Sequence, residues 1–165
     1  MKLDLEVPVG GITVFVHQAC IMREHLDELG HANYNKLKDI FETARHSLFK
    51  YLGSGRKTLR KKLQLGFVMT EDSYIYHKAL KENDVIFFFA KIEIVGPTRI
   101  IVRLRVCRWL MLEDPTKFAE LTNEATYHMA LINLKTEKPV RIPVPIKKQI
   151  KDYTDTVTRL STEWK

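Results

Sequence analysis

The segment from about Asn33 to Leu52 constrains the fold most, because it is the longest run of the chain with clear helical periodicity. Asn33 is a favourable N-cap, and Gly53 stands at the C′ position that commonly ends a helix. Apolar side chains recur every three or four residues and so share one helix face: Tyr34, Leu37, Phe41, Ala44, Leu48 and Leu52, with Ile40 and Tyr51 at its sides. We therefore predict a helix whose wide apolar face another part of the chain must cover.

Segments rich in β-branched and aromatic residues predict five strands, one before this helix and four after it. They are Ile12–Met22, Phe67–His77, Val85–Val95, Arg99–Leu112 and Thr122–Leu134. The four later strands are separated by short polar or turn-forming segments, which predicts hairpin connections and antiparallel pairing. Residues 1–10 are expected to be a lead-in, and a C-terminal helix is expected from about Ile146, with Ile150, Tyr153, Val157 and Leu160 on one side.

A helix with so wide an apolar face needs a large partner, and a single antiparallel sheet is the only candidate among these elements. We predict an α+β fold in which a curved sheet of about five strands wraps the long helix. A chain of 165 residues, 45% of them hydrophobic, suits one domain over 1–165, with a C-terminal extension from about 146. The open edges of such a sheet favour pairing between subunits.

The net charge of +7 indicates an anionic partner, which could be nucleic acid, a membrane surface or a phosphate-bearing molecule. The densest basic cluster, Arg56–Lys62, is either a solvated loop or short helix, or a landing site for phosphates. It contains no aromatic residue, so nucleic-acid binding ranks low. No apolar run reaches the roughly 20 residues of a membrane span. The first residues carry acids and no signal-like apolar stretch, so a cytoplasmic location is expected.

Two cysteines, Cys20 and Cys107, stand far apart without a CxxC or Cys/His cluster, so neither a metal site nor a redox pair is expected.

Four residues with functional chemistry precede the helix directly: His25, Asp27, Gly30 and His31. On the residues alone, Asp27 is either a cap or loop organiser, or an acid placed for chemistry beside a helix N-terminus. The backbone N–H groups at the start of a helix, here around Asn33 to Asn35, lack intrahelical partners and can stabilise an oxyanion.

The stretch Asp27-Glu28-Leu29-Gly30-His31-Ala32-Asn33-Tyr34, followed by Glu42-Thr43-Ala44-Arg45, resembles the hotdog-fold acyl-CoA thioesterases of the 4-hydroxybenzoyl-CoA thioesterase type. Two later segments are also similar to that family: Tyr74–Leu80 with Asn83-Asp84, and Pro139–Pro143. The resemblance covers roughly residues 12–145. The Arg56–Lys62 cluster lies outside the shared pattern.

The resemblance implies a hotdog fold and hydrolysis of an acyl-CoA thioester, with Asp27 as nucleophile or general base. It further implies substrate or oxyanion contacts by Gly30, His31, Asn33 and Tyr34, although Tyr34 could instead pack in the core. Arg45 is expected to pair with a carboxylate, with Glu42 as one candidate.

Coenzyme A would be part of substrate and product rather than a cofactor, bound by a homodimer or homotetramer. Its phosphates would meet basic side chains, for which the candidates are Arg99, Arg103, Arg105, Arg56 and Lys57. The alternative is a non-catalytic hotdog module that binds acyl-CoA or acyl carrier protein. The acyl group, its chain length and the role of His25 stay open at this point.

Overall fold

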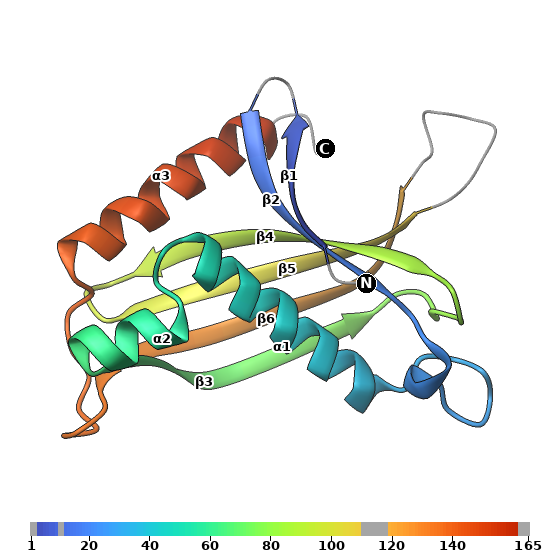
Figure 1. The fold of residues 1–165 in the computed structure, drawn as a ribbon, viewed down its shortest axis with the longest axis horizontal. Coiled ribbons are helices and arrows are strands. Elements are labelled where there is room, and N and C mark those ends of the chain that lie inside the picture. The colour runs from blue at the N-terminus through green and yellow to red at the C-terminus, as the bar shows by residue number, and fades with distance from the viewer. Residues whose placement is uncertain (1–2, 10–11, 110–118, 162–165) are drawn as a thin grey trace.

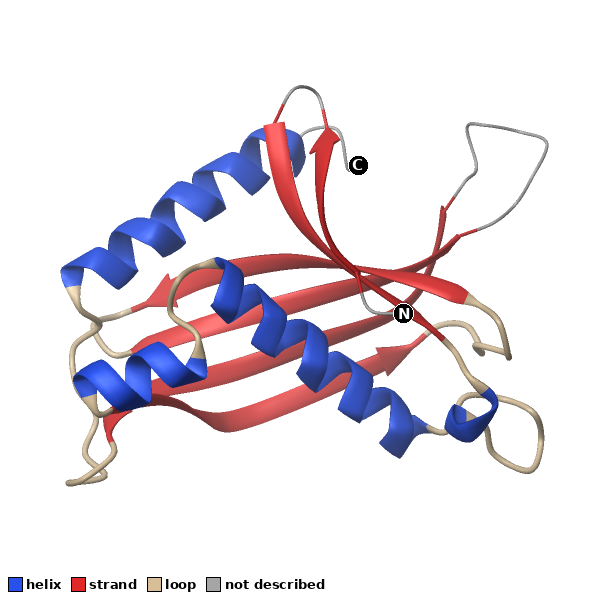
Figure 2. Ribbon diagram, in the orientation of Figure 1, coloured by secondary structure: helices blue, strands red, loops and turns tan. Residues whose placement is uncertain are grey.

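The computed structural model describes residues 3–9, 12–109 and 119–161. Within these ranges the chain forms one antiparallel sheet of six strands in the order β1-β2-β4-β5-β6-β3 (Figures 1 and 2). The strands are β1 (Leu3–Val9), β2 (Ile12–Cys20), β3 (Leu65–Tyr76), β4 (Val85–Val95), β5 (Arg99–Trp109) and β6 (Ala119–Asn133). The helices are α1 (Tyr34–Tyr51), α2 (Arg56–Thr58) and α3 (Val144–Ser161), with 3₁₀ helix η1 (Arg23–His25) and π-helix η2 (Leu59–Leu63).

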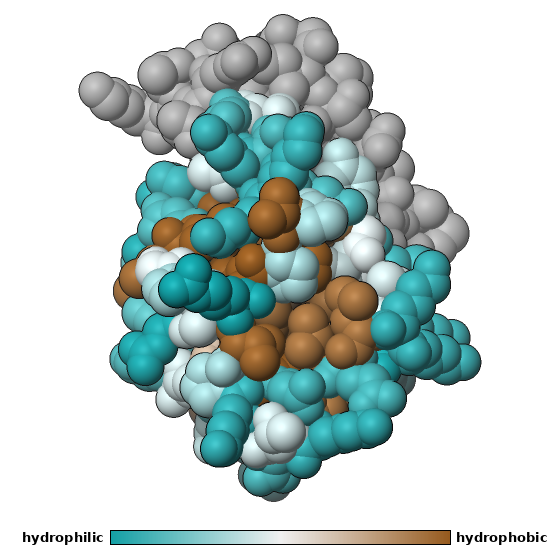
Figure 3. All heavy atoms as spheres, turned by 90° about the vertical axis from the view of Figure 1, so that its left-hand side faces the viewer, coloured by the Kyte–Doolittle hydropathy of each residue, from teal (hydrophilic) through white to brown (hydrophobic). Residues whose placement is uncertain are grey.

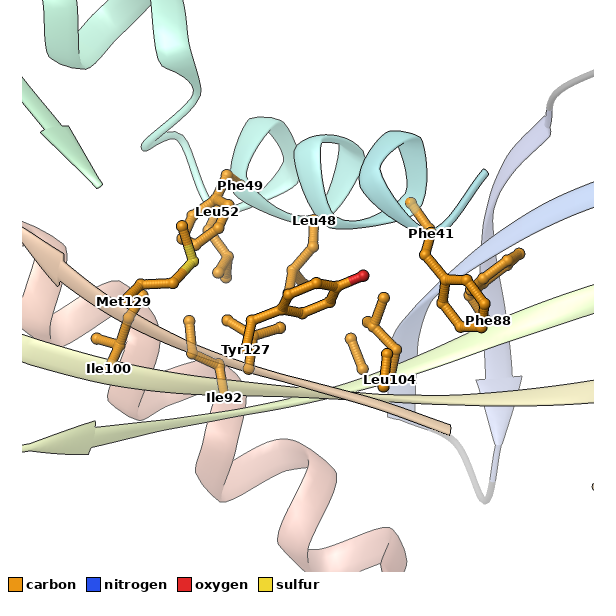
Figure 4. Close-up of a cluster of buried hydrophobic side chains, with 14 of the residues drawn as sticks. Phe41, Leu48, Phe49, Leu52, Phe88, Ile92, Ile100, Leu104, Tyr127 and Met129 are labelled. Carbon is orange, nitrogen blue, oxygen red and sulfur yellow. The ribbon is translucent and has the colours of Figure 1, made fainter. Parts of the chain in front are cut away.

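The predicted packing of a long helix against a curved sheet is confirmed, because α1 packs across the sheet. Asn33 caps α1 by accepting a hydrogen bond from the Asn35 N–H at 2.9 Å, and Gly53 adopts φ +66° just after the helix. The side chains on the inner face of α1 contact those of β4, β5 and β6 in one apolar cluster (Figure 4). Full burial of such a side chain stabilises the fold by about 1.5–3 kcal/mol.

The buried face of α1 is rotated slightly from the predicted stripe. Tyr34 and Tyr51 are exposed, whereas Phe49 and the side chain of Arg45 are buried. The predicted core role of Tyr34 is therefore wrong. The side chain lies outside the core because the helix has only just begun there.

The lead-in expected over residues 1–10 is wrong, because Leu3–Val9 forms the edge strand β1 paired with β2. Apolar and polar residues alternate through Leu-Asp-Leu-Glu-Val-Pro-Val, which is the period of a half-buried strand. The sheet consequently has six described strands instead of about five. Pro8 is compatible with this position because β1 is an edge strand.

The order of the strands departs from a simple series of hairpins. β4, β5 and β6 follow one another as predicted, but β3 pairs with β6 rather than with its neighbour in sequence, β4. The segment Lys78–Asp84 is therefore a crossover instead of a hairpin turn. The residues after Trp109, including the predicted strand end at Leu112 and the connection Glu113–Lys117, lie outside the described residues.

The C-terminal helix α3 joins the same core as α1. Its predicted side is confirmed for Ile150 and Tyr153, which are buried, and for Val157, which packs against the core. The Tyr153 hydroxyl donates a 2.8 Å hydrogen bond to the Ala90 carbonyl of β4. α3 therefore lies beside α1 against β4, as Figure 1 shows.

Candidate active site

The loop before α1 is held in shape by Asp27. Its Oδ1 accepts hydrogen bonds from the backbone N–H groups of Leu29 at 2.9 Å and His31 at 3.1 Å. The Asp27 N–H donates to the His31 carbonyl at 2.8 Å, so the loop closes on itself. Gly30 has φ +75°, a conformation that favours glycine. The structure therefore gives Asp27 the loop-organising role through one carboxylate oxygen.

The second oxygen of Asp27, Oδ2, makes no hydrogen bond within the part of the chain that the structure describes. Asp27 is exposed. The space beside Gly30 is also open, because a Cβ added there would meet no described atom within 4 Å. One oxygen is thus fixed by the loop while the other faces outward and can react or hold a water molecule. The two alternatives for Asp27, organiser and reactive acid, are compatible in this geometry.

Hydrogen bonds on both sides anchor the loop to the body of the protein. The Ala32 N–H donates at 2.8 Å to the carbonyl of Leu80, which is buried in the β3–β4 crossover. The Asn33 N–H donates at 2.8 Å to the His25 carbonyl, and the His25 Nδ1 accepts from the Met22 N–H at 2.9 Å. The structure therefore gives His25 a role in fixing the turn that leads into the loop.

Of the three backbone donors that the sequence suggested at the start of α1, one is free in the described structure. The Asn33 N–H is bonded to His25 and the Asn35 N–H to the Asn33 side chain. The Tyr34 N–H makes no hydrogen bond within the described residues, so it is the donor available to a developing oxyanion. The imidazole of His31 and the ring of Tyr34 are both exposed beside it.

The five candidate phosphate ligands do not gather in one place on the protomer. Arg103 and Arg105 alternate along β5 with buried residues that face α1, so they project from the opposite face of the sheet. Arg99 is exposed at the start of the same strand. Lys57 lies on α2 at the other side of the sheet, where Arg56 begins the helix.

On the outer face, both arginines are already paired with carboxylates. Arg103 donates to Glu93 at 2.7 Å, and this hydrogen bond lowers the pKa of Glu93. Arg105 donates to Glu124 at 3.1 Å. The pKa of Glu124 is lowered mainly by its 2.9 Å hydrogen bond to His77, with Arg105 adding to the effect.

At the middle of α1, Arg45 belongs to a cluster of polar and aromatic side chains, of which the sequence predicted only the pairing with a carboxylate. Arg45 pairs with Glu42 at 2.5 Å, as one alternative expected, and its guanidinium lies 5.3 Å from the ring centroid of Tyr127. Tyr127 packs edge to face on Tyr74 of the edge strand, at 5.9 Å between centroids. Burial raises the pKa of Tyr74 to about 12 and raises that of Tyr127 further. The alternation of β6 alone does not predict the contact of Tyr127 with Arg45, because an inward-facing tyrosine follows the same alternation as any core residue.

Two cavities flank α1, with volumes of about 760 and 370 Å³. The smaller cavity lies between β2, η1 and α1 and includes His25 in its lining. The larger cavity lies between the second half of α1, α2, η2 and the adjoining ends of β3 and β6. Asp27 lines neither, so within one protomer its carboxylate faces open surface.

Among the described residues, no cluster of three or more His, Cys, Asp or Glu side chains is placed to hold a metal ion. In the same ranges, no helix has the length and apolar character needed to span a membrane.

Comparison by sequence finds neither a matching family model nor a matching curated protein. Comparison by structure finds hotdog proteins. A hypothetical protein of Staphylococcus aureus, solved in complex with CoA, has a TM-score of 0.77 and 21% identity over 88% of this chain and 86% of its own.

Two further structures resemble the chain over most of their length. A 1,4-dihydroxy-2-naphthoyl-CoA thioesterase from Synechocystis has a TM-score of 0.72 and 15% identity, covering 84% of this chain and 96% of its own. A thioesterase-superfamily protein of Jannaschia has a TM-score of 0.75 and 14% identity, covering 95% and 96%. The chain therefore has the hotdog fold, and the predicted fold class is confirmed.

Proposed function

We propose that the protein is an acyl-CoA thioesterase, which hydrolyses the thioester of an acyl-CoA to the free acid and CoA. The observation that carries the proposal is the Asp27 loop. One carboxylate oxygen is fixed by two backbone N–H groups, the other is available, and the loop ends at a helix N-terminus with an unbonded N–H. Several structures that share the fold are named thioesterases, and one was solved with CoA, which supports the same class of reaction.

In this mechanism the Tyr34 N–H donates a hydrogen bond to the thioester oxygen as negative charge develops on it. Asp27 Oδ2 acts in one of two ways. As a nucleophile it attacks the carbonyl carbon, CoA leaves as the thiolate, and water hydrolyses the resulting anhydride. As a general base it takes a proton from the water that attacks the same carbon. Both routes use the orientation that the Leu29 and His31 N–H groups impose on the carboxylate.

We further propose that the enzyme works as a homodimer or homotetramer, because the exposed Asp27 needs a second surface to exclude water from the reaction. The sheet ends at β3 on one side and at β1 on the other. Three large apolar side chains of the edge strand β3 are exposed: Met69, Ile75 and Tyr76. A second copy added at such an edge satisfies its unpaired backbone groups.

The phosphate contacts of CoA remain a prediction for Arg99, Arg103, Arg105, Arg56 and Lys57. Pairing with Glu93 and Glu124 makes Arg103 and Arg105 the weaker candidates in the isolated protomer, because a phosphate must compete with a bound carboxylate. Exposed Arg99 and Lys57 carry no such ion pair within the described residues.

The test is release of free thiol from a panel of acyl-CoA substrates of increasing chain length, together with aryl-CoA substrates. Hydrolysis should be measurable for at least one substrate and should be lost in Asp27→Asn. Glu28→Gln is the matched control, since it removes the neighbouring exposed carboxylate and should keep the activity. Binding of acyl-CoA without thiol release across the whole panel would instead favour the alternative, a non-catalytic module for acyl-CoA or acyl carrier protein.

A further inference from the structure

The larger cavity is separate from the Asp27 loop and has a wall that the resemblance does not account for. The cationic helical segment Arg56–Leu63, made of α2 and η2, forms one side of it. The end of the molecule at which α2 lies shows an apolar area bordered by hydrophilic residues (Figure 3). The lining of the cavity likewise combines an apolar interior with a polar margin.

The interior walls are aromatic and aliphatic. Phe49 of α1, Leu59 of η2 and Met129 of β6 line the cavity and are each at most 5% exposed. The rings of Phe49 and Phe67 stack at 5.3 Å between centroids with an interplanar angle of 23°. A volume of about 760 Å³ falls within the range of about 300–1,000 Å³ typical of sites for organic ligands.

The margin is cationic. Lys50, Lys57 and Arg60 line the cavity and are exposed, so their charged groups stand at its outer side. Among the described residues, Glu42 is the one carboxylate in the lining, and it is bonded to Arg45. A ligand that matches both parts has an apolar body and a single anionic end.

Arg45 adds an observation from inside the cavity. This side chain is 8% exposed, and its Nε makes no hydrogen bond within the described residues. One of its terminal nitrogens contacts only the weak acceptor Met129 Sδ, at 3.5 Å. The inner wall therefore keeps unused donor capacity, which a bound polar group or water can satisfy.

The placement of charges on the segment Arg56–Leu63 is selective. Lys57 and Arg60 line the cavity, whereas Lys61 and Lys62 are exposed and do not. A π-helical turn occupies Leu59–Leu63, and turns of this kind are frequent at functional sites. Leu59, the buried residue of this turn, forms part of the wall while the lysines that follow it face solvent.

We propose that this cavity is a binding site for a free long-chain carboxylate, a fatty-acid-type anion. Its alkyl chain lies between Phe49, Leu59 and Met129, and its carboxylate lies at the margin formed by Lys50, Lys57 and Arg60. The site is distinct from the Asp27 loop, and the inference does not depend on the proposed hydrolysis.

The test is titration of the full-length protein with a dansylated undecanoate probe, followed by displacement with dodecanoate and dodecanol. Saturable binding of one probe per chain is expected. Dodecanoate should displace the probe well and dodecanol poorly, because the alcohol lacks the charge. Lys57→Glu/Arg60→Glu should raise the Kd about tenfold, whereas Lys61→Glu/Lys62→Glu, which changes the net charge equally, should leave it within about twofold.

Several outcomes would overturn the proposal. They are absence of saturable binding, an equal effect of the two charge-reversal pairs, and binding only to anionic lipid vesicles. Thr58→Trp provides a second variant, since it places a large ring on an exposed lining residue without touching the core, and it should weaken probe binding. Asp27→Asn should leave probe binding unchanged, so failure of this proposal and failure of the thioesterase proposal are distinguishable.

Discussion

Substitution of Asp27 by Asn and by Ala separates the structural from the chemical role of this carboxylate. Oδ1 accepts two backbone hydrogen bonds, at 2.9 and 3.1 Å, in an exposed loop. At such a position each bond contributes about 1 kcal/mol, so Asp27→Ala should lower the free energy of unfolding by about 2 kcal/mol. For a domain of this size that loss corresponds to a decrease in Tm of about 4–8 °C.

Asp27→Asn retains an acceptor oxygen for the same N–H groups, so it should cost less than about 1 kcal/mol. Both variants lose the ionisable oxygen and should lose thioesterase activity by a factor of about 10² to 10⁴. The assays are thermal unfolding at one protein concentration and thiol release at saturating acyl-CoA, with Glu28→Gln as control. An Asp27→Asn protein with full activity would show that Asp27 only organises the loop.

Three further predictions concern stability. Asn33→Ala removes the cap of α1 and should cost about 1 kcal/mol, or about 2–4 °C in Tm, whereas Asn33→Asp should not. Arg45→Ala breaks the part-buried ion pair with Glu42 and the contact with the Tyr127 ring and should cost about 2 kcal/mol by denaturant unfolding; an unchanged midpoint would contradict this. Because the pKa of Glu124 is lowered in the fold, its contribution is complete above the reference value of 4.5 and is lost as the pH falls below it. Glu124→Gln should therefore flatten the decline of Tm in acid, and an unaltered decline would refute the assignment.

The sequence predicts α1 well, because the residues that its helical periodicity places on one face are those that pack against the sheet. Periodicity places Leu37, Phe41, Ala44 and Leu48 on one face, and all four are buried. Local chemistry also predicts the N-cap at Asn33. Burial of Arg45 escapes such reasoning, because the aromatic ring of Tyr127 that receives the guanidinium comes from a strand more than 80 residues later.

Strand existence follows from composition, but strand order does not. Segments such as Val85–Val95 carry a strong β signal, yet no local feature indicates that β3 pairs with β6. The same limit applies to Arg103 and Arg105. Alternation predicts their exposure, whereas their pairing with Glu93 and Glu124 depends on cross-strand register.

For the candidate site, the sequence predicts which residues are present. The structure adds which of their atoms already make hydrogen bonds. Two of the three N–H groups expected to bind an oxyanion are bonded, one by the cap that also identifies the helix start. Proximity in sequence suffices to place Asp27 beside the helix. It does not specify the hydrogen bonds, because these depend on the path of a loop anchored through Leu80.

The pairing of β3 with β6 has a consequence for the folding pathway. β3 follows the central helix in the chain after α2 and η2, but its partner β6 is the last strand to be synthesised, with β4 and β5 between them. Contacts of such large sequence separation form slowly because of the loop that must close. Leu65–Tyr76 should therefore gain protection later than the β4–β5–β6 meander in refolding followed by hydrogen exchange. Until then the nascent chain carries an apolar helix beside a strand that has no partner.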